Sequence, residues 1–254
     1  MTNLLFPLLI VIGAALLGMA SIMLKHRFFP PNPEPEEGEG RDGVGEYVAM
    51  MVGVLYALIL GIVLVSVWEG RDNAENSVQT EASSLNQVYI LAQDIPAPAG
   101  PRIQQDVKAY ATLVVNQEWP QMASHQDLGQ AGWQSLTKLT NAIEAYQPVT
   151  DVQQNVSAQA LSQLSTVYDA RRSRNGESTD SLSPVLWVGL ILGGVLTVAF
   201  VFCFGVQRRG THVAMVMGLT GLIGFLVLMV FDLNHPFSGS MGIDSGVYTQ
   251  YFSS

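Results

Sequence analysis

The sequence has little charge, a single cysteine and none of the common catalytic motifs. Asp, Glu, Lys and Arg make up 13% of the 254 residues, which is about half the fraction typical of soluble proteins. One cysteine, Cys203, cannot form an intrachain disulfide, so it does not indicate a redox compartment. The nucleophile-elbow, zinc-protease, phosphate-loop and dinucleotide-binding signatures are absent. We therefore expect neither an enzyme nor a bound cofactor.

Basic residues are also scarce. The chain has 12 Lys and Arg against 21 Asp and Glu, which gives a net charge of −9. Without a basic patch, nucleic acid is not an expected partner. Asp232 and His235 follow the last apolar run, but one acid and one histidine are weak evidence for a metal. We therefore expect no metal site.

Charge is absent altogether from four apolar runs. They are Leu4–Leu24, Tyr47–Trp68, Val185–Val206 and Val213–Phe231. Each run is close to the roughly 20 residues that a membrane-spanning helix needs, and none carries the intramembrane carboxylate of a proton-coupled transporter. Because Lys25 and Arg27 follow the first run rather than precede it, we interpret it as a retained span and not as a cleaved signal peptide. The sequence predicts an all-α protein with four transmembrane helices in a lipid bilayer.

The second run does not end at the membrane boundary. No proline follows it until Pro96, and apolar residues continue at helical spacing from Ala74 to Ala92. This pattern predicts one helix from Glu46 to Gln93, on the order of 70 Å long, about twice the thickness of a hydrocarbon core. A helix that leaves the bilayer with an apolar seam needs partners outside it.

The segment between the second and third runs is predicted to be a helical domain. Helices are expected from Pro101 to Glu118, where Trp119-Pro120 breaks the pattern, from Trp133 to Tyr146, and from an N-cap at Thr150 to Arg174. The last helix and the extension of the second span are expected to pack antiparallel as a stalk. The predicted organisation is residues 1–68, two spans with a Pro-, Glu- and Gly-rich linker at 28–45; residues 69–184, a helical extramembrane domain; and residues 185–254, two spans with a short C-terminal tail.

The distribution of Lys and Arg predicts the orientation in the membrane. Basic residues in the first loop and in the turn before the fourth run are Lys25, Arg27, Arg41, Arg208 and Arg209. The first three residues and the tail after Phe231 contain none. Since short cytoplasmic loops are the basic ones, both termini and residues 69–184 are expected outside.

One candidate set lies within the second run. Ala49, Gly53, Ala57 and Gly61 recur every four residues, so they share one helix face on which backbones can approach closely. This small-residue row suits tight packing within one subunit. It also suits packing between subunits around a pore, and the pattern alone does not decide between the two.

A second candidate set lies just beyond the run. Glu69, Asp72, Asn76 and Gln79 are three or four residues apart, on the face opposite the apolar seam. In a single chain this would be a solvated face. In a symmetric oligomer each residue forms a ring, and rings of carboxylates favour cations. We therefore treat these four residues as candidates for a pore mouth or selectivity site, whose charge Arg71 would partly neutralise.

Short motifs resemble a bestrophin-like family of bacterial membrane proteins. These are Val54–Gly61 with Val67-Trp68 and Asp72-Asn73-Ala74; Glu81–Leu85; Glu118-Trp119-Pro120; Asp169–Arg174 with Pro184–Trp187; and Pro236–Gly239. They occur in the expected order and cover the chain from about Tyr47 onward.

The resemblance implies a homo-oligomeric ion channel in the bacterial inner membrane, pentameric and lined by the second span, with inorganic ions as partners. Bestrophins conduct anions and keep their extramembrane domain in the cytosol, whereas the acidic face suits cations and the charge count places residues 69–184 outside. The second span also lacks the aromatic constriction of bestrophins, and the chain lacks their acidic calcium-binding motif. The alternative is a non-conducting, membrane-anchored interaction or sensory protein that uses its helical domain.

Overall fold

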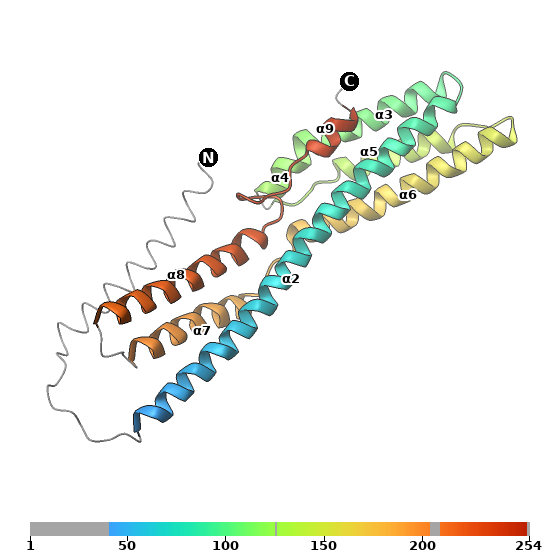
Figure 1. Ribbon diagram of the computed structural model, residues 1–254. Coiled ribbons are helices and arrows are strands. Elements are labelled where there is room, and N and C mark those ends of the chain that lie inside the picture. Colours follow the sequence, from blue (N-terminus) through green and yellow to red (C-terminus); the bar gives the residue numbers. More distant parts are fainter. Residues whose placement is uncertain (1–40, 125, 204–208, 253–254) are drawn as a thin grey trace. The chain divides into compact units, whose positions relative to one another are not determined.

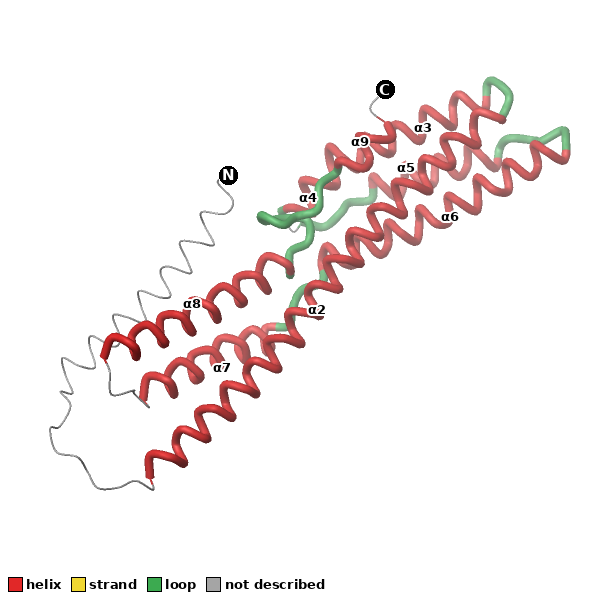
Figure 2. Tube along the Cα trace, in the orientation of Figure 1, coloured by secondary structure: helices red, strands yellow, loops and turns green. Residues whose placement is uncertain are grey.

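The computed structural model describes residues 41–124, 126–203 and 209–252, and all the regular secondary structure in these residues is helical (Figure 1 and Figure 2). The helices are α2 (Arg41–Leu91), the 3₁₀ turn η2 (Ala92–Asp94), α3 (Ala99–Leu113), the π-helix η3 (Val114–Glu118), α4 (Trp119–Ala123), α5 (Ala131–Glu144), α6 (Asp151–Thr179), α7 (Pro184–Cys203), α8 (Arg209–Leu233) and α9 (Gly246–Phe252). The predicted all-α class is confirmed. The described residues divide into two compact units, which we call the membrane unit (residues 41–68 and Leu182–Asn234) and the outer unit (Glu69–Ser181 and residues 235–252).

Three described helices are long and apolar enough to cross a membrane. They are the helix over Tyr47–Asp94, Pro184–Val201 and Val213–Leu233. At most 17% of the most apolar window of each is buried, so large apolar surfaces are left for lipid or for other helices. The fourth predicted span, Leu4–Leu24, lies outside the described residues.

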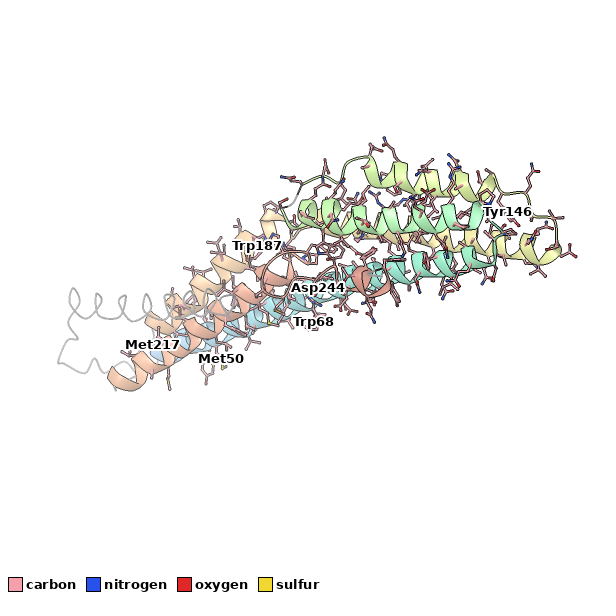
Figure 3. The ribbon with its side chains drawn as sticks, turned by 90° about the horizontal axis from the view of Figure 1, so that it is seen from above. Met50, Trp68, Tyr146, Trp187, Met217 and Asp244 are labelled. Atoms are coloured by element: carbon pink, nitrogen blue, oxygen red, sulfur yellow. The ribbon has the colours of Figure 1, made fainter. Side chains whose placement is uncertain are left out.

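Glycine allows close packing in the membrane unit. A Cβ atom on Gly193 of α7 would lie 2.5 Å from the Tyr56 ring of α2, so only glycine leaves room for this aromatic side chain. Trp187 of α7, labelled in Figure 3, packs edge-to-face on Phe231 of α8, with ring centroids 6.1 Å apart. These contacts join the three described helices of this unit.

The outer unit has its own apolar core, and its two long helices run antiparallel. Ser77 of α2 donates to Glu177 of α6, and Glu81 pairs with Arg174. Residue numbers therefore increase along α2 in the direction in which they decrease along α6. This agrees with the predicted stalk. The Thr150 hydroxyl accepts a hydrogen bond from the Gln153 amide, as expected of an N-cap.

Two predicted helix ends are wrong. The chain does not break at Trp119-Pro120, because η3 widens the helix so that the Trp119 amide donates to the carbonyl of Val114, five residues back. This wider turn lets the helix continue past a proline that has no N–H to donate. In addition, α6 runs beyond Arg174 to Thr179, because Arg174 is buried inside the unit rather than solvated at a helix end.

The C-terminal residues form part of the outer unit. Residues after Asn234 continue into α9, which lies beside α3 (Figure 1). Phe237 and Tyr248 are both buried, and each packs edge-to-face on Trp119. The Trp119 indole N–H also donates to the carbonyl of Ile243. The segment that the sequence suggests is a short tail therefore completes the core around α4.

Candidate functional site

Helix α2 presents two opposite faces along its length. Its buried face consists of Tyr56, Leu60, Val63, Val67, Ala74, Val78, Glu81, Leu85 and Val88. Its opposite face, which we call the exposed stripe, consists of Val54, Leu58, Gly61, Val65, Glu69, Asp72, Asn76, Gln79 and Ser83. Residues of the exposed stripe recur every three or four positions, and those of the buried face do so except between Val67 and Ala74, which are seven apart. All four predicted mouth residues therefore lie on one exposed face, which is apolar up to Val65 and polar from Glu69 onward.

Arg71, the basic residue next to the acidic part of the exposed stripe, is bonded elsewhere. Arg71 donates through Nη1 to Glu75 at 2.8 Å and through Nε to the carbonyl of Met241 at 3.0 Å. The Asn76 amide donates to Asp72 at 3.3 Å. Arg71 is thus engaged with Glu75 and the C-terminal segment, so the expected neutralisation falls on Glu75 rather than on Glu69 or Asp72.

The small-residue row lines a groove within the membrane unit. Ala49 and Gly53 are half-buried, whereas Ala57 and Gly61 are exposed. All four line an open, mainly apolar groove of about 600 Å³, together with Met50 (Figure 3) and residues of α7 and α8 that include Thr197 and Leu222. Of the two glycines in the row, Gly53 lies near another helix, because an added Cβ would lie 3.9 Å from Thr197, an ordinary van der Waals contact. A Cβ added at Gly61 would have no neighbour within 4 Å.

The structure also reveals a site that the sequence reasoning missed, a fully buried ionic network in the outer unit. Arg174 donates from Nε to Glu81 at 2.6 Å and from Nη2 to Glu81 and Glu118 at 3.1 and 2.7 Å. Arg171 donates to the other Glu118 oxygen at 2.5 Å. The Tyr110 hydroxyl donates to Glu81 at 2.6 Å. These five residues, which we call the buried network, carry two positive and two negative charges and leave little net charge in the core.

Apolar and aromatic contacts enclose the buried network. The Arg171 guanidinium lies 4.1 Å from the centroid of the Trp133 ring, which is a cation–π contact. Arg174 also contacts the sulfur of Met122 at 3.2 Å. A Cβ on Gly132 would clash with Glu118 Oε1 and Arg171 Nη2, so glycine is required where α5 passes this pair. The packing leaves the charged groups no access to solvent.

The pKa values of Tyr110 and Arg174 in the buried network differ from their ordinary values. Burial raises the pKa of the Tyr110 hydroxyl well above its ordinary value, and the neighbouring Glu81 charge adds to this effect. Burial alone would lower the pKa of Arg174, but the charge and hydrogen bond of Glu81, together with Tyr248 and Tyr110, outweigh burial and hold that pKa well above its ordinary value. Both groups therefore stay protonated at any physiological pH, and the buried network is a fixed hydrogen-bonded unit.

A signal for the buried network was present in the sequence. Glu81 continues the α2 seam of Ala74, Val78 and Leu85, and Arg171 and Arg174 continue the α6 seam of Ala160, Leu164 and Val167, all at spacings of three or four. Charged residues at seam positions face the same way as their apolar neighbours. Three of the family motifs, Glu81–Leu85, Glu118-Trp119-Pro120 and Asp169–Arg174, meet at this point.

Another groove, lined by both polar and apolar residues, lies elsewhere in the outer unit, along α5 and the start of α3. Its volume is about 940 Å³, and its lining includes Arg102, Trp133, Lys138 and Tyr146 (Figure 3) but no acidic residue. Lys138 is held by the buried carboxylate of Asp106 at 2.6 Å. In the described part of the chain, no group of three or more His, Cys, Asp or Glu residues could hold a metal ion.

Comparisons with known proteins identify the fold and the family. A membrane protein known from a crystal structure superimposes with a TM-score of 0.72 at 11% identity, over 97% of this chain and 96% of that one. A bacterial bestrophin homologue from Klebsiella pneumoniae, carrying a leucine-to-threonine substitution, also gives 0.72 at 11% identity, over 99% and 97%. Among curated protein sequences, none is significantly similar to the chain. The family model for the bestrophin-like domain matches residues 12–248, so the chain belongs to the bestrophin-like family.

Proposed function

We propose that the protein is a homo-oligomeric ion channel of bestrophin-like type in which α2 faces the symmetry axis. The observation that carries this proposal is the exposed stripe, which lies on the face of α2 opposite the face buried within the subunit. Around an axis, Val54, Leu58 and Val65 would form apolar rings, and the polar rings would begin at Glu69. Apolar constrictions and rings of charge are the two devices by which channels gate and select ions.

Cation preference follows from the same stripe. Glu69 and Asp72 are exposed, and Arg71 is engaged by Glu75, so a ring of these carboxylates would retain a negative potential. The neutral variants Glu69→Gln and Asp72→Asn should shift the reversal potential toward anions under a salt gradient. Asp169→Asn, which removes an exposed acid on α6 instead, is the matched control. No shift in the first two variants would remove both residues from the ion path.

Conduction itself is tested with purified protein in planar bilayers. We expect single-channel currents from a defined oligomer, pentameric by family resemblance, whose stoichiometry mass photometry can measure in parallel. A folded oligomer that stays silent across voltages, ions and pH values would contradict the channel, and so would a monomer. The proposed location is the bacterial inner membrane with residues 69–184 outside.

A second candidate function is a non-conducting interaction or sensory protein. The observation that favours it is the groove along α5, whose volume lies within the range of small-molecule sites. Its only charged lining residues, Arg102 and Lys138, are basic, although residues 69–184 contain more acids than bases. This function predicts that a partner or ligand is captured by the outer unit, that Arg102→Ala reduces this capture, and that no current accompanies it.

A further inference from the structure

The buried network places charges in an apolar interface between two helices. Glu81 occupies a seam position of α2, and Arg174 occupies a seam position of α6. Apolar side chains in such a seam tolerate small rotations and shifts of one helix against the other. A polar residue in the seam tolerates few such rotations or shifts, because only one arrangement of the helices supplies its hydrogen-bond partners. Single polar residues fix the register of coiled coils in this way.

The geometry of the pair leaves little freedom. Arg174 holds both Glu81 oxygens, at 2.6 and 3.1 Å, and also holds Glu118 at 2.7 Å. A rotation of α2 by one residue would turn Glu81 through about 100° and separate it from this planar fork. Glu81 would then lack its partners in a dry core, and Arg174 would keep only its bond to Glu118. Leaving a carboxylate buried and unpaired costs several kcal/mol.

Stability alone does not require charges at these positions. Apolar residues of similar volume often replace a buried ion pair with no loss of stability, or with a gain. What they do not supply is a single preferred rotation. The ion pair therefore contributes a defined rotation of α2 about its own axis rather than additional stability.

Rotation of α2 determines which residues leave the core. Gln79 and Ser83 are each two positions from Glu81, about 200° around the helix, and both are exposed. We infer that Glu81 and Arg174 are positioning residues, whose ion pair sets the rotation of α2 and so holds the polar half of the exposed stripe away from the core and toward the ion path. The ion path is that of the proposed function, on which this inference rests.

The test compares the water accessibility of opposite faces of α2 in the full-length protein. Single cysteines replace Gln79, Ser83, Val78 or Leu85, each in a Cys203→Ser background, and a small charged methanethiosulfonate reagent measures the rate of modification. With the network intact, cysteines at Gln79 and Ser83 should react at least about tenfold faster than those at Val78 and Leu85. The measurement is repeated with Glu81→Leu, Glu118→Leu, Arg171→Met and Arg174→Met combined.

The inference predicts that this apolar variant stays folded while the ratio of rates falls toward one and ion selectivity is lost. Arg174→Lys keeps the positive charge but cannot bond both oxygens of Glu81 as the guanidinium does, so it should also lower the ratio of rates. This variant replaces the apolar variant in the test if the apolar variant does not fold. As a matched control, Asp106→Asn with Lys138→Gln removes an ion pair that joins α3 to α5 and should leave the ratio unchanged.

The two possible failures are distinguishable. An unchanged ratio in both the apolar variant and Arg174→Lys overturns the positioning role, whether or not the protein conducts. Absence of current from the unmodified protein contradicts the channel instead, and the labelling ratio still decides whether the pair sets the rotation of α2.

Discussion

Arg174 and Glu81 lie 93 positions apart in the sequence, yet Nε of one is 2.6 Å from Oε2 of the other, and neither is exposed to solvent. Removing one partner would leave a buried charge uncompensated. We therefore expect Arg174→Met to lower the free energy of unfolding by about 3–5 kcal/mol. The exposed pair of Arg172 and Asp169 gives the control, since Arg172→Met should cost at most about 1 kcal/mol. Thermal unfolding of the detergent-solubilised protein measures both, and equal losses would contradict the prediction.

The two buried tyrosines beside the network should differ in their contribution. Tyr110 donates to the ionised Glu81, and loss of a hydrogen bond to a charged group costs about 1.5–3 kcal/mol, so Tyr110→Phe should be destabilising. The Tyr248 hydroxyl is buried near the Glu81 carboxylate but makes no hydrogen bond as well formed as that of Tyr110, so Tyr248→Phe should cost less than Tyr110→Phe. The same unfolding assay compares them, and a larger loss for Tyr248→Phe would show that the two roles are reversed.

Replacing Gly132 and Gly176 by alanine should change the stability of the protein in opposite directions. A Cβ on Gly132 meets Glu118 and Arg171, whereas one on Gly176 of α6 has nothing within 4 Å. Gly132→Ala should displace the ion pair and cost several kcal/mol, of the order of breaking it. Gly176→Ala should stabilise by about 0.5–1 kcal/mol, because alanine favours a helix interior. Melting temperatures that move in the same direction would be inconsistent with this packing.

Glu177 should make the stability of the outer unit depend on pH. Burial raises the pKa of this carboxyl above 4.5, and its hydrogen bond from Ser77 offsets only part of the shift. The folded state therefore binds the proton more tightly than the unfolded state. Its contribution to stability is full below the unfolded pKa and is lost as pH rises through the folded pKa.

Accordingly, the gain in melting temperature of Glu177→Gln over the unmodified protein should grow from pH 4 to pH 7. Glu144→Gln, on an exposed position of α5, controls for the loss of one negative charge. A gain that shrinks with rising pH would contradict the direction of the shift.

The orientation of the outer unit is open to a direct measurement. A cysteine at the exposed Glu144, in a Cys203→Ser background, should react with a membrane-impermeant maleimide added to intact cells, because short-loop charges predict residues 69–184 outside. A cysteine at Gln93, also exposed in the outer unit, should behave identically. Labelling of both only after lysis would place the unit in the cytosol, as the resemblance to bestrophins implies.

Much of the fold follows from local signals. The absence of proline and the regular apolar spacing after Trp68 predict the long α2, which runs to Leu91 and continues through η2 to Asp94. Thr150 signals the start of α6 in the same direct way. These features depend on neighbouring residues only, so one sequence suffices to find them.

The buried network depends on contacts between distant segments, which explains why it was missed. Arg171 and Arg174 resemble a solvated helix end when only their neighbours are considered. They become buried because Glu81 and Glu118, from two other helices, neutralise them. The π-helix that brings Glu118 into place likewise reflects tertiary packing, which overrides the breaking tendency of Pro120.

The place of the C-terminal segment in the outer unit has a consequence for biosynthesis. Trp119 and Tyr110 emerge from the ribosome long before Phe237 and Tyr248, and α7 and α8 are made in between. The core of the outer unit therefore cannot be completed during translation until the last helix has been synthesised. Until then, the apolar surface around Trp119 stays exposed. Chains that stop before Phe237 should consequently be degraded or aggregate, even though α7 and α8 have already been made.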